Sequence, residues 1–251
     1  MSCAQTTVIV RPKGASETRR REEAAHQVLS AFGALPAGRL LCYFDEQDCW
    51  AFKDGTLGLG KANRGLSGPV TKPTDFQGWP WEVVSCIYTS LSVDDSQAAF
   101  DFVTYLHDSS CEDPVGLTMT FAHELQHFIQ WATMPTVWEA NARFVKRRLE
   151  SVAGFDSHEL PVEKDARIVA KRIAIRIHGR EAVDRCIEKN IANPMDDLDQ
   201  RNWLFVKGLD VAKPFDVELE TVLFGNDLKS EPLPLKTRRR HDSSNNGLTH
   251  A

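Results

Sequence analysis

The segment 116–131, GLTMTFAHELQHFIQW, constrains the fold of this chain more than any other stretch. Apolar residues occur all round it, no proline interrupts it, and Glu124 is its only acidic residue. A helix that is apolar on every side is buried. The pattern HExxH places His123 and His127 one helical turn apart on one face, where both imidazoles can bind a single metal ion.

Glu124 lies beside these two histidines in the pattern. A carboxylate and two imidazoles are costly to bury unless something pairs with them, and one metal ion pairs with all three. In zinc hydrolases a carboxylate at this place takes a proton from water. We therefore expect Zn²⁺ bound by His123 and His127, with Glu124 as the general base. The alternative is a core helix whose histidines only form hydrogen bonds.

The composition describes a folded protein rather than a nucleic-acid or membrane-surface binder. The chain has 251 residues, 42% hydrophobic and 26% charged, which predicts one soluble globular domain with or without a tail. A net charge of -5 argues against nucleic-acid and membrane partners. No apolar run reaches the roughly 18 residues of a membrane span, and segment 1–21 is too weakly apolar for a secretory signal. We expect a cytoplasmic protein.

The six cysteines are scattered and form no CxxC pair. In a chain of this size we expect them to be reduced and mostly buried thiols. A zinc site in this chain must then be built from histidine and carboxylate. The cysteines are Cys3, Cys42, Cys49, Cys86, Cys111 and Cys186.

The periodicity predicts an α+β fold, in which a small mixed or antiparallel sheet precedes a helical part that carries the HExxH helix. The sheet is expected at about 39–95, with strands at 39–45, 49–55 and 81–93 and a further short strand at 8–10. The glycine-rich segment 58–73 is predicted to be a long turn region.

Helices are predicted from their apolar spacing and their proline and glycine boundaries. They are expected at 17–32, 96–108, from about 115 through the HExxH motif, 135–152, 162–178, 180–192, 202–209 and 217–224. We expect one domain over 1–228, with active-site helices at about 96–178 and a helical extension at 180–228. The polar segment 229–251 lacks periodicity and is predicted to be a disordered tail.

A catalytic zinc site needs a third protein ligand, and the sequence offers two carboxylates for it. The pattern HExxHxxGxxH is absent, because Gln130 and Thr133 occupy its last two positions. Glu163 and Glu139 each begin an ExxAR segment, whose alanine allows close packing on the HExxH helix. Only a tight turn fits between His127 and Glu139, whereas a full helix fits before Glu163. We favour Glu163 and keep Glu139 as the alternative.

The residues 120–129, TFAHELQHFI, resemble the extended signature of zincins. HExxH followed at a distance by ExxA resembles the gluzincin-type metallopeptidases, including the ImmA/IrrE-like group. Within this resemblance His123, His127 and Glu163 match the metal ligands, and Glu124 matches the general base. The resemblance implies a zincin-like domain that hydrolyses peptide bonds with zinc.

Two details qualify how the chain matches these families. The segment WEANA at 138–142 is similar to the WxxEGxA segment of aminopeptidase-like gluzincins, which would make Glu139 the third ligand. The ExxA segment carries Asp165, Ala166 and Arg167 where the ImmA-like group tends to have Ala-Asn. The resemblance covers about 96–178 and leaves the rest of the chain unexplained.

The expected function is that of an intracellular zinc metallopeptidase of narrow specificity, acting on a protein or peptide substrate. Its transition state needs a donor for the developing oxyanion, and His158 and Tyr105 are the candidates. An edge strand of the sheet is expected to bind extended substrates. Two alternatives remain: a non-catalytic regulatory or binding module on a zincin scaffold, and a helical protein with an accidental HExxH.

Overall fold

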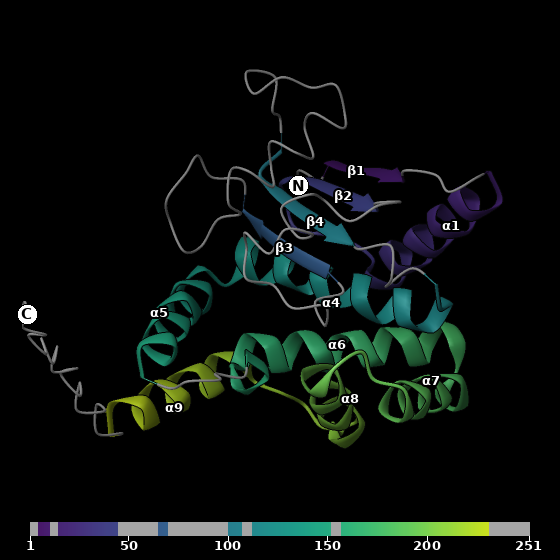
Figure 1. The fold of residues 1–251 in the computed structure, drawn as a ribbon. Coiled ribbons are helices and arrows are strands. Elements are labelled where there is room, and N and C mark those ends of the chain that lie inside the picture. The colour runs from purple at the N-terminus through teal and green to yellow at the C-terminus, as the bar shows by residue number, and fades with distance from the viewer. Residues whose placement is uncertain are drawn as a thin grey trace, which may run out of the picture.

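The computed structural model describes residues 5–10, 15–44, 65–69, 100–106, 112–151 and 157–230. The fold in this part is a mixed sheet with helices layered beneath it (Figure 1). The four strands are β1 Gln5–Val10, β2 Arg39–Phe44, β3 Gly65–Pro69 and β4 Phe102–Leu106.

The strand order is β1-β2-β4-β3, and only β3 runs antiparallel to its neighbour. Parallel neighbours need a crossover connection, and helix α1, Ala15–Phe32, provides it between β1 and β2. Within the described sheet, β3 is therefore an edge strand. The predicted mixed sheet is confirmed.

Two strands correct the sequence prediction. The helix predicted at 96–108 is wrong, because Phe102–Leu106 forms β4 between β2 and β3. This run of aromatic and β-branched residues is fully buried, and such residues suit a pleated, packed surface. The turn predicted at 58–73 is wrong for Gly65–Pro69, which pairs with β4 as β3. The strands predicted at 49–55 and 81–93 lie outside the described residues.

The predicted helices at 17–32, around the HExxH motif and after Pro135 are confirmed. The helices predicted at 202–209 and 217–224 are longer than expected. The last of these, α9 at Val217–Ser230, extends two residues into the predicted tail, whose remainder, 231–251, lies outside the described residues. The helices that follow the sheet are α4 Pro114–Thr133, α5 Pro135–Ser151, α6 Pro161–His178, α7 Arg180–Ala192, α8 Asp197–Gly208 and α9 Val217–Ser230, with a short 3₁₀ helix, η3, at Ser157–Glu159.

Helix α4 begins where its sequence provides a cap. The Asp113 carboxylate accepts hydrogen bonds from the backbone N–H groups of Val115 and Gly116, at 2.9 and 3.0 Å. Pro114 occupies the first helical position, where a missing N–H costs nothing. The start of the HExxH helix is thus specified locally.

Helix α4 lies between the sheet and α6 (Figure 1). Its sheet-facing side packs Phe121, Leu125 and Phe128 into a cluster that includes Phe44 and Phe102 from the central strands. Its other side packs along α6, and α7 and α8 lie on the far side of α6. This sandwiched position explains why the segment is apolar all round, and it confirms the predicted burial.

Among the described residues, the two cysteines Cys42 and Cys186 are buried and are not disulfide-bonded, as predicted for them. The other four lie outside the described residues. None of the described helices is both long enough and apolar enough to cross a membrane.

Candidate metal centre

Three side chains from α4 and α6 converge on one point. His123 Nε2 lies 3.1 Å from His127 Nε2, so the two ring nitrogens face each other. The Glu163 carboxylate meets both, with Oε2 at 3.3 Å from His123 Nε2 and Oε1 at 3.4 Å from His127 Nε2. One ligand atom from each residue lies within 4.8 Å of the others, so this group could hold a metal ion.

The helix geometry produces this convergence. His123 and His127 are one turn apart on α4, and Glu163 lies in the first turn of α6, just after Pro161. The two helices approach closely where Ala166, one turn beyond Glu163, is fully buried. A small residue at that point therefore allows the Glu163 carboxylate to reach the histidines, as the ExxA spacing predicted.

A hydrogen bond orients the His127 ring. Its Nδ1 lies 2.8 Å from Gln130 Oε1. The amide nitrogen of Gln130 donates in turn to Val162 O at 2.9 Å and to Asp165 Oδ2 at 2.8 Å, which turns the amide oxygen toward His127. Since that oxygen can only accept, Nδ1 carries a proton, and in the neutral ring the lone pair is therefore on Nε2. This is the tautomer that a metal ligand requires.

Asp165 of α6 accepts hydrogen bonds from the buried polar side chains of α4. Its Oδ2 accepts a second hydrogen bond from Gln126 Nε2 at 2.8 Å, and the side chains involved are buried. Asp165 is one of the positions at which the chain differs from the ImmA-like pattern, and Gln130 replaces a glycine of the HExxHxxGxxH pattern. Neither residue had a predicted role. The sequence feature that could have indicated this role is the presence of two glutamines, Gln126 and Gln130, on a helix predicted to be buried.

The charges of the three converging groups depend on one another. Burial lowers the pKa of His123. Burial also opposes the charge of His127, but the Glu163 carboxylate outweighs it and raises the pKa of His127 to about 9. For Glu163, the two imidazoles and Arg167, at 2.9 Å, outweigh the effect of burial and hold its pKa well below the usual range. Glu163 is thus ionised at neutral pH, as a metal ligand must be.

Glu124 lies beside this group and points toward the sheet. It is 6% exposed, and its Oε2 accepts a hydrogen bond of 2.6 Å from Ser67 Oγ on β3. Its carboxylate is therefore separate from the three converging side chains. This placement leaves Glu124 available for proton transfer next to a bound ion.

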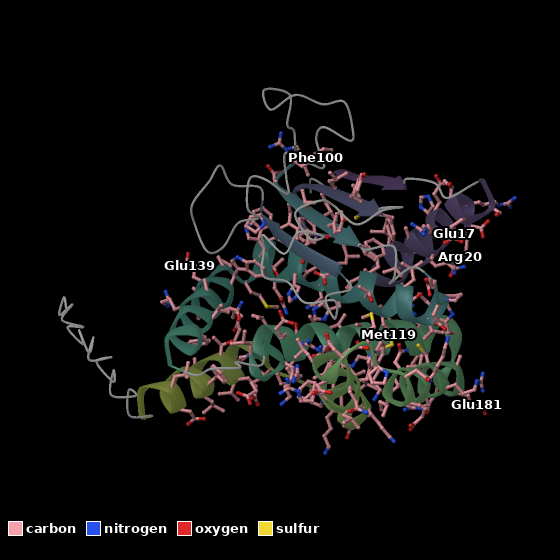
Figure 2. The ribbon with its side chains drawn as sticks, viewed as in Figure 1. Glu17, Arg20, Phe100, Met119, Glu139 and Glu181 are labelled. Carbon is pink, nitrogen blue, oxygen red and sulfur yellow. The ribbon has the colours of Figure 1, made fainter. Side chains whose placement is uncertain are left out.

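Glu139, the alternative third ligand, does not join the group. It is exposed on α5 and lies at the outer side of that helix (Figure 2). Its neighbour Trp138 is the residue that faces the site, with its ring centroid 6.0 Å from that of His127. Of the two candidates, the structure brings Glu163 to the histidines.

The two proposed oxyanion donors occupy packing positions. Tyr105 stacks on Tyr43 of the neighbouring strand, with ring centroids 5.8 Å apart. Side chains alternate along a strand, and Phe102 and Leu106 face α4, so Tyr105 faces the opposite side of the sheet. His158 is buried and stacks on Phe205 of α8 at 5.3 Å. The sheet therefore turns Tyr105 away from the metal group, whereas the donor role of His158 stays a prediction.

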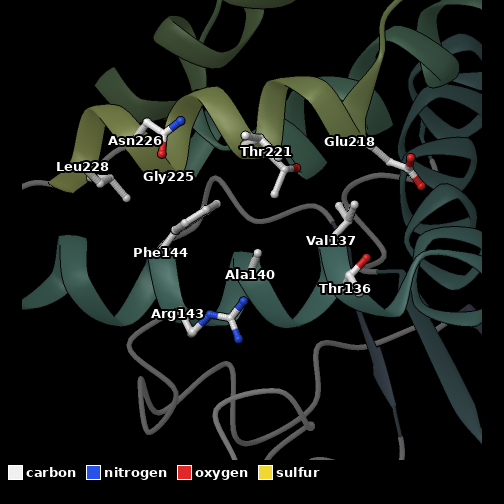
Figure 3. Close-up of a pocket in the computed structure, with 11 residues that line it drawn as sticks. Thr136, Val137, Ala140, Arg143, Phe144, Glu218, Thr221, Gly225, Asn226 and Leu228 are labelled. Carbon is white, nitrogen blue, oxygen red and sulfur yellow. The ribbon is translucent and has the colours of Figure 1, made fainter. Parts of the chain in front are cut away.

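A separate hollow of about 670 Å³ lies between α5 and α9 (Figure 3). It shares no residue with the metal group. Val137, Ala140 and Phe144 line it from α5, and Thr221 and Gly225 line it from α9.

Comparisons with protein-family models, with curated proteins and with solved structures gave no match to this chain. The chemistry of the site must therefore be inferred from its own residues.

Proposed function

We propose that the protein is a zinc-dependent metallopeptidase with a zincin-like fold, in which His123, His127 and Glu163 bind the ion. The observation that carries this proposal is the convergence of two imidazole nitrogens and one carboxylate from two packed helices. Among the described residues these three would be the protein ligands, and catalytic zinc is typically bound by three protein ligands and a water. A fully closed structural site would need another protein ligand.

The donor chemistry fits zinc. Neutral imidazole and carboxylate are both established zinc ligands, whereas calcium and magnesium prefer oxygen donors throughout. The Gln130 hydrogen bond that sets the His127 tautomer supports the same choice, because ligating histidines almost always donate their other N–H to a neighbour.

Zinc in such a site supplies a Lewis acid, which makes water a stronger acid and polarises a carbonyl group. Glu124 accepts a proton from the attacking water and passes it to the leaving amine, so one carboxylate acts first as base and then as acid. Burial of Glu124 next to the three ligands supports this role.

The position of β3 at the edge of the described sheet supports a peptide substrate. An extended chain can add to an open strand edge through main-chain hydrogen bonds, which do not depend on side-chain identity. Ser67 on this strand touches Glu124, so a peptide aligned on β3 would lie close to the proposed base. We therefore propose a protein or peptide substrate.

Elemental analysis of the purified chain tests the metal site. We expect one zinc per chain in the wild type and in Glu139→Ala, and loss of zinc in His123→Ala and Glu163→Ala. Glu139→Ala is the matched control, because it removes an exposed glutamate from the neighbouring helix. A zinc-free wild type after reconstitution, or equal zinc in all four proteins, would refute the site.

Mass spectrometry of a tryptic peptide library incubated with the zinc-loaded protein tests the activity. Glu124→Gln should keep zinc and lose cleavage by about 100-fold or more, since a positioned acid–base group contributes that much. Bound zinc without cleavage by the wild type would indicate the non-catalytic module instead.

A further inference from the structure

We propose that Ser67 is a positioning residue, which holds one oxygen of Glu124 so that the other is presented for proton transfer. This inference rests on the proposed function. Ser67 Oγ donates to Glu124 Oε2 at 2.6 Å, and both groups lie where β3 passes over α4. A hydrogen bond to a charged group is short and directional, so it fixes the rotation of the carboxylate.

Gly65, two residues earlier on β3, keeps the other oxygen accessible. A Cβ atom at this position would lie 3.0 Å from Glu124 Oε1, 3.0 Å from Glu124 Cγ and 3.0 Å from Thr120 Cγ2. At this distance a neighbouring group must move by a few tenths of an ångström, so a side chain at position 65 would press on the Glu124 carboxylate. Glycine is therefore the residue that allows the strand to approach Glu124 so closely.

The strand register explains why these two residues act together. Residues i and i+2 of a strand point to the same face, so Gly65 and Ser67 both face α4. Their partners on β4 are Leu106 and Thr104, and Leu106 belongs to the core that packs on α4. The Ser67 hydroxyl on β3 thus binds Oε2 of Glu124. Because Gly65 has no side chain, the same strand does not press on Oε1.

Thr104 provides a matched control. It lies directly opposite Ser67 in the register and is fully buried, yet its hydroxyl has no hydrogen-bond partner among the described residues. Thr104→Val therefore removes a hydroxyl from the same layer without removing a contact to Glu124.

A thermal double-mutant cycle on the zinc-free protein tests the contact itself. Ser67→Ala should lower the Tm by about 4 °C in the wild type and by about 1 °C or less in a Glu124→Ala background. Thr104→Val should lower it in neither background. Equal shifts by Ser67→Ala in both backgrounds would overturn the proposal.

Turnover of the tryptic peptide library tests the positioning role, because a purely structural contact would not change it selectively. Ser67→Ala should lower kcat about tenfold or more with KM and zinc content unchanged, and Ser67→Thr should restore it. Gly65→Ala should also keep zinc and lose turnover. Gly208→Ala is its control, since a Cβ there meets nothing within 4 Å.

The outcomes separate this inference from the proposed function. A coupled Tm shift with wild-type turnover in Ser67→Ala would refute positioning. If the wild type binds zinc but cleaves no peptide, the proposed peptidase function fails, and so does the catalytic part of this inference, while the cycle still decides whether Ser67 holds Glu124.

Discussion

At the scale of single residues, the polar groups around α4 matter because they are few and each has a defined partner. Gln130 is fully buried. Its amide nitrogen donates hydrogen bonds to Val162 and Asp165 on α6, and its amide oxygen accepts one from His127. A buried amide with all its bonds made favours one orientation. It therefore transmits the position of α6 to the ring that would bind the metal.

We expect Gln130→Leu to weaken zinc binding by about 10- to 100-fold, because loss of such an outer partner frees the tautomer and rotation of the ligand ring. Competition with a fluorescent chelator measures this affinity. Gln126→Leu is the control: it removes a bond to the same Asp165 oxygen without touching His127, and its zinc affinity should stay close to wild type. Equal losses in both variants would contradict the assigned role.

Glu17 on α1 makes stability depend on pH. A hydrogen bond from Arg20, with a further contribution from Arg21, lowers the pKa of Glu17 from 4.5 to about 2. Because the folded-state pKa is depressed, the contribution is complete above about pH 4.5 and is lost as the pH falls toward 2. Glu17→Gln should cost about 1 kcal/mol at pH 7, since the pairs are partly screened by solvent.

Urea unfolding of wild type and Glu17→Gln at pH 7, 4 and 2.5 checks this prediction, and the difference between them should shrink as the pH falls. Glu23→Gln is the control, because the ion pair of Glu23 with Arg19 is largely exposed and should contribute little at any pH. A difference for Glu17→Gln that does not vary with pH would contradict the prediction.

At the scale of elements, local pattern predicted most of the helices and the strands β1 and β2, but it missed β3 and β4. The helices after residue 114 have apolar periodicity and proline or glycine boundaries of their own. β4 has the five residues FVTYL, which are too few to distinguish a strand from a helix by period. β3, GLSGP, has low strand propensity and owes its conformation to pairing with β4.

The end of α8 depends on a buried lysine from α6. Lys171 Nζ donates to the carbonyl oxygens of Val206, Lys207 and Leu209 at 2.9, 3.1 and 3.0 Å. These carbonyls lie at the C-terminus of the helix, where few backbone donors remain, although Val206 O also accepts from the Leu209 N–H at 3.3 Å. One charged group thus joins the two helices and caps one of them.

We expect Lys171→Met to lower the free energy of unfolding by about 3 kcal/mol, because it removes three hydrogen bonds made by one charged, buried donor. Urea unfolding measures the loss. Arg172→Met is the control, since Arg172 bonds the carbonyls of Val211 and Lys213 at an exposed position, and it should cost about 1 kcal/mol or less. A Lys171→Met variant as stable as Arg172→Met would contradict the capping role.

At the scale of the whole molecule, the proposed ion would join α4, which packs on the sheet, to α6, which packs against α7 and α8. A ligand that binds only the folded state stabilises it by mass action, by about 2.7 kcal/mol at 100 times its Kd. For a chain of this length that corresponds to a Tm increase of about 5 to 10 °C.

Thermal unfolding with zinc in excess and with chelator should therefore differ by about that amount in the wild type and in Glu139→Ala. Glu163→Ala should lose the difference, because it lacks the ligand from α6. A zinc-dependent shift of full size in Glu163→Ala would show that the ion does not connect the two helices through this carboxylate.

Much of the proposed site is local in the chain and was therefore predictable. His123, Glu124 and His127 lie within two turns of one helix, whose period and cap are specified by neighbouring residues. The burial of that helix followed from its apolar surroundings. The preference for Glu163 came from chain length and family resemblance, and Glu139 remained open because both begin the same ExxAR pattern.

The sequence by itself thus determined the helix that carries the histidines and the chemistry they favour, because both depend on spacing along one element. The tertiary structure alone brought Glu163 rather than Glu139 to them, and joined Gln130 to Asp165 and Ser67 to Glu124. Ser67 and Glu124 are 57 residues apart. Contacts of that separation depend on how the sheet and helices pack, and no local pattern in a single sequence encodes them.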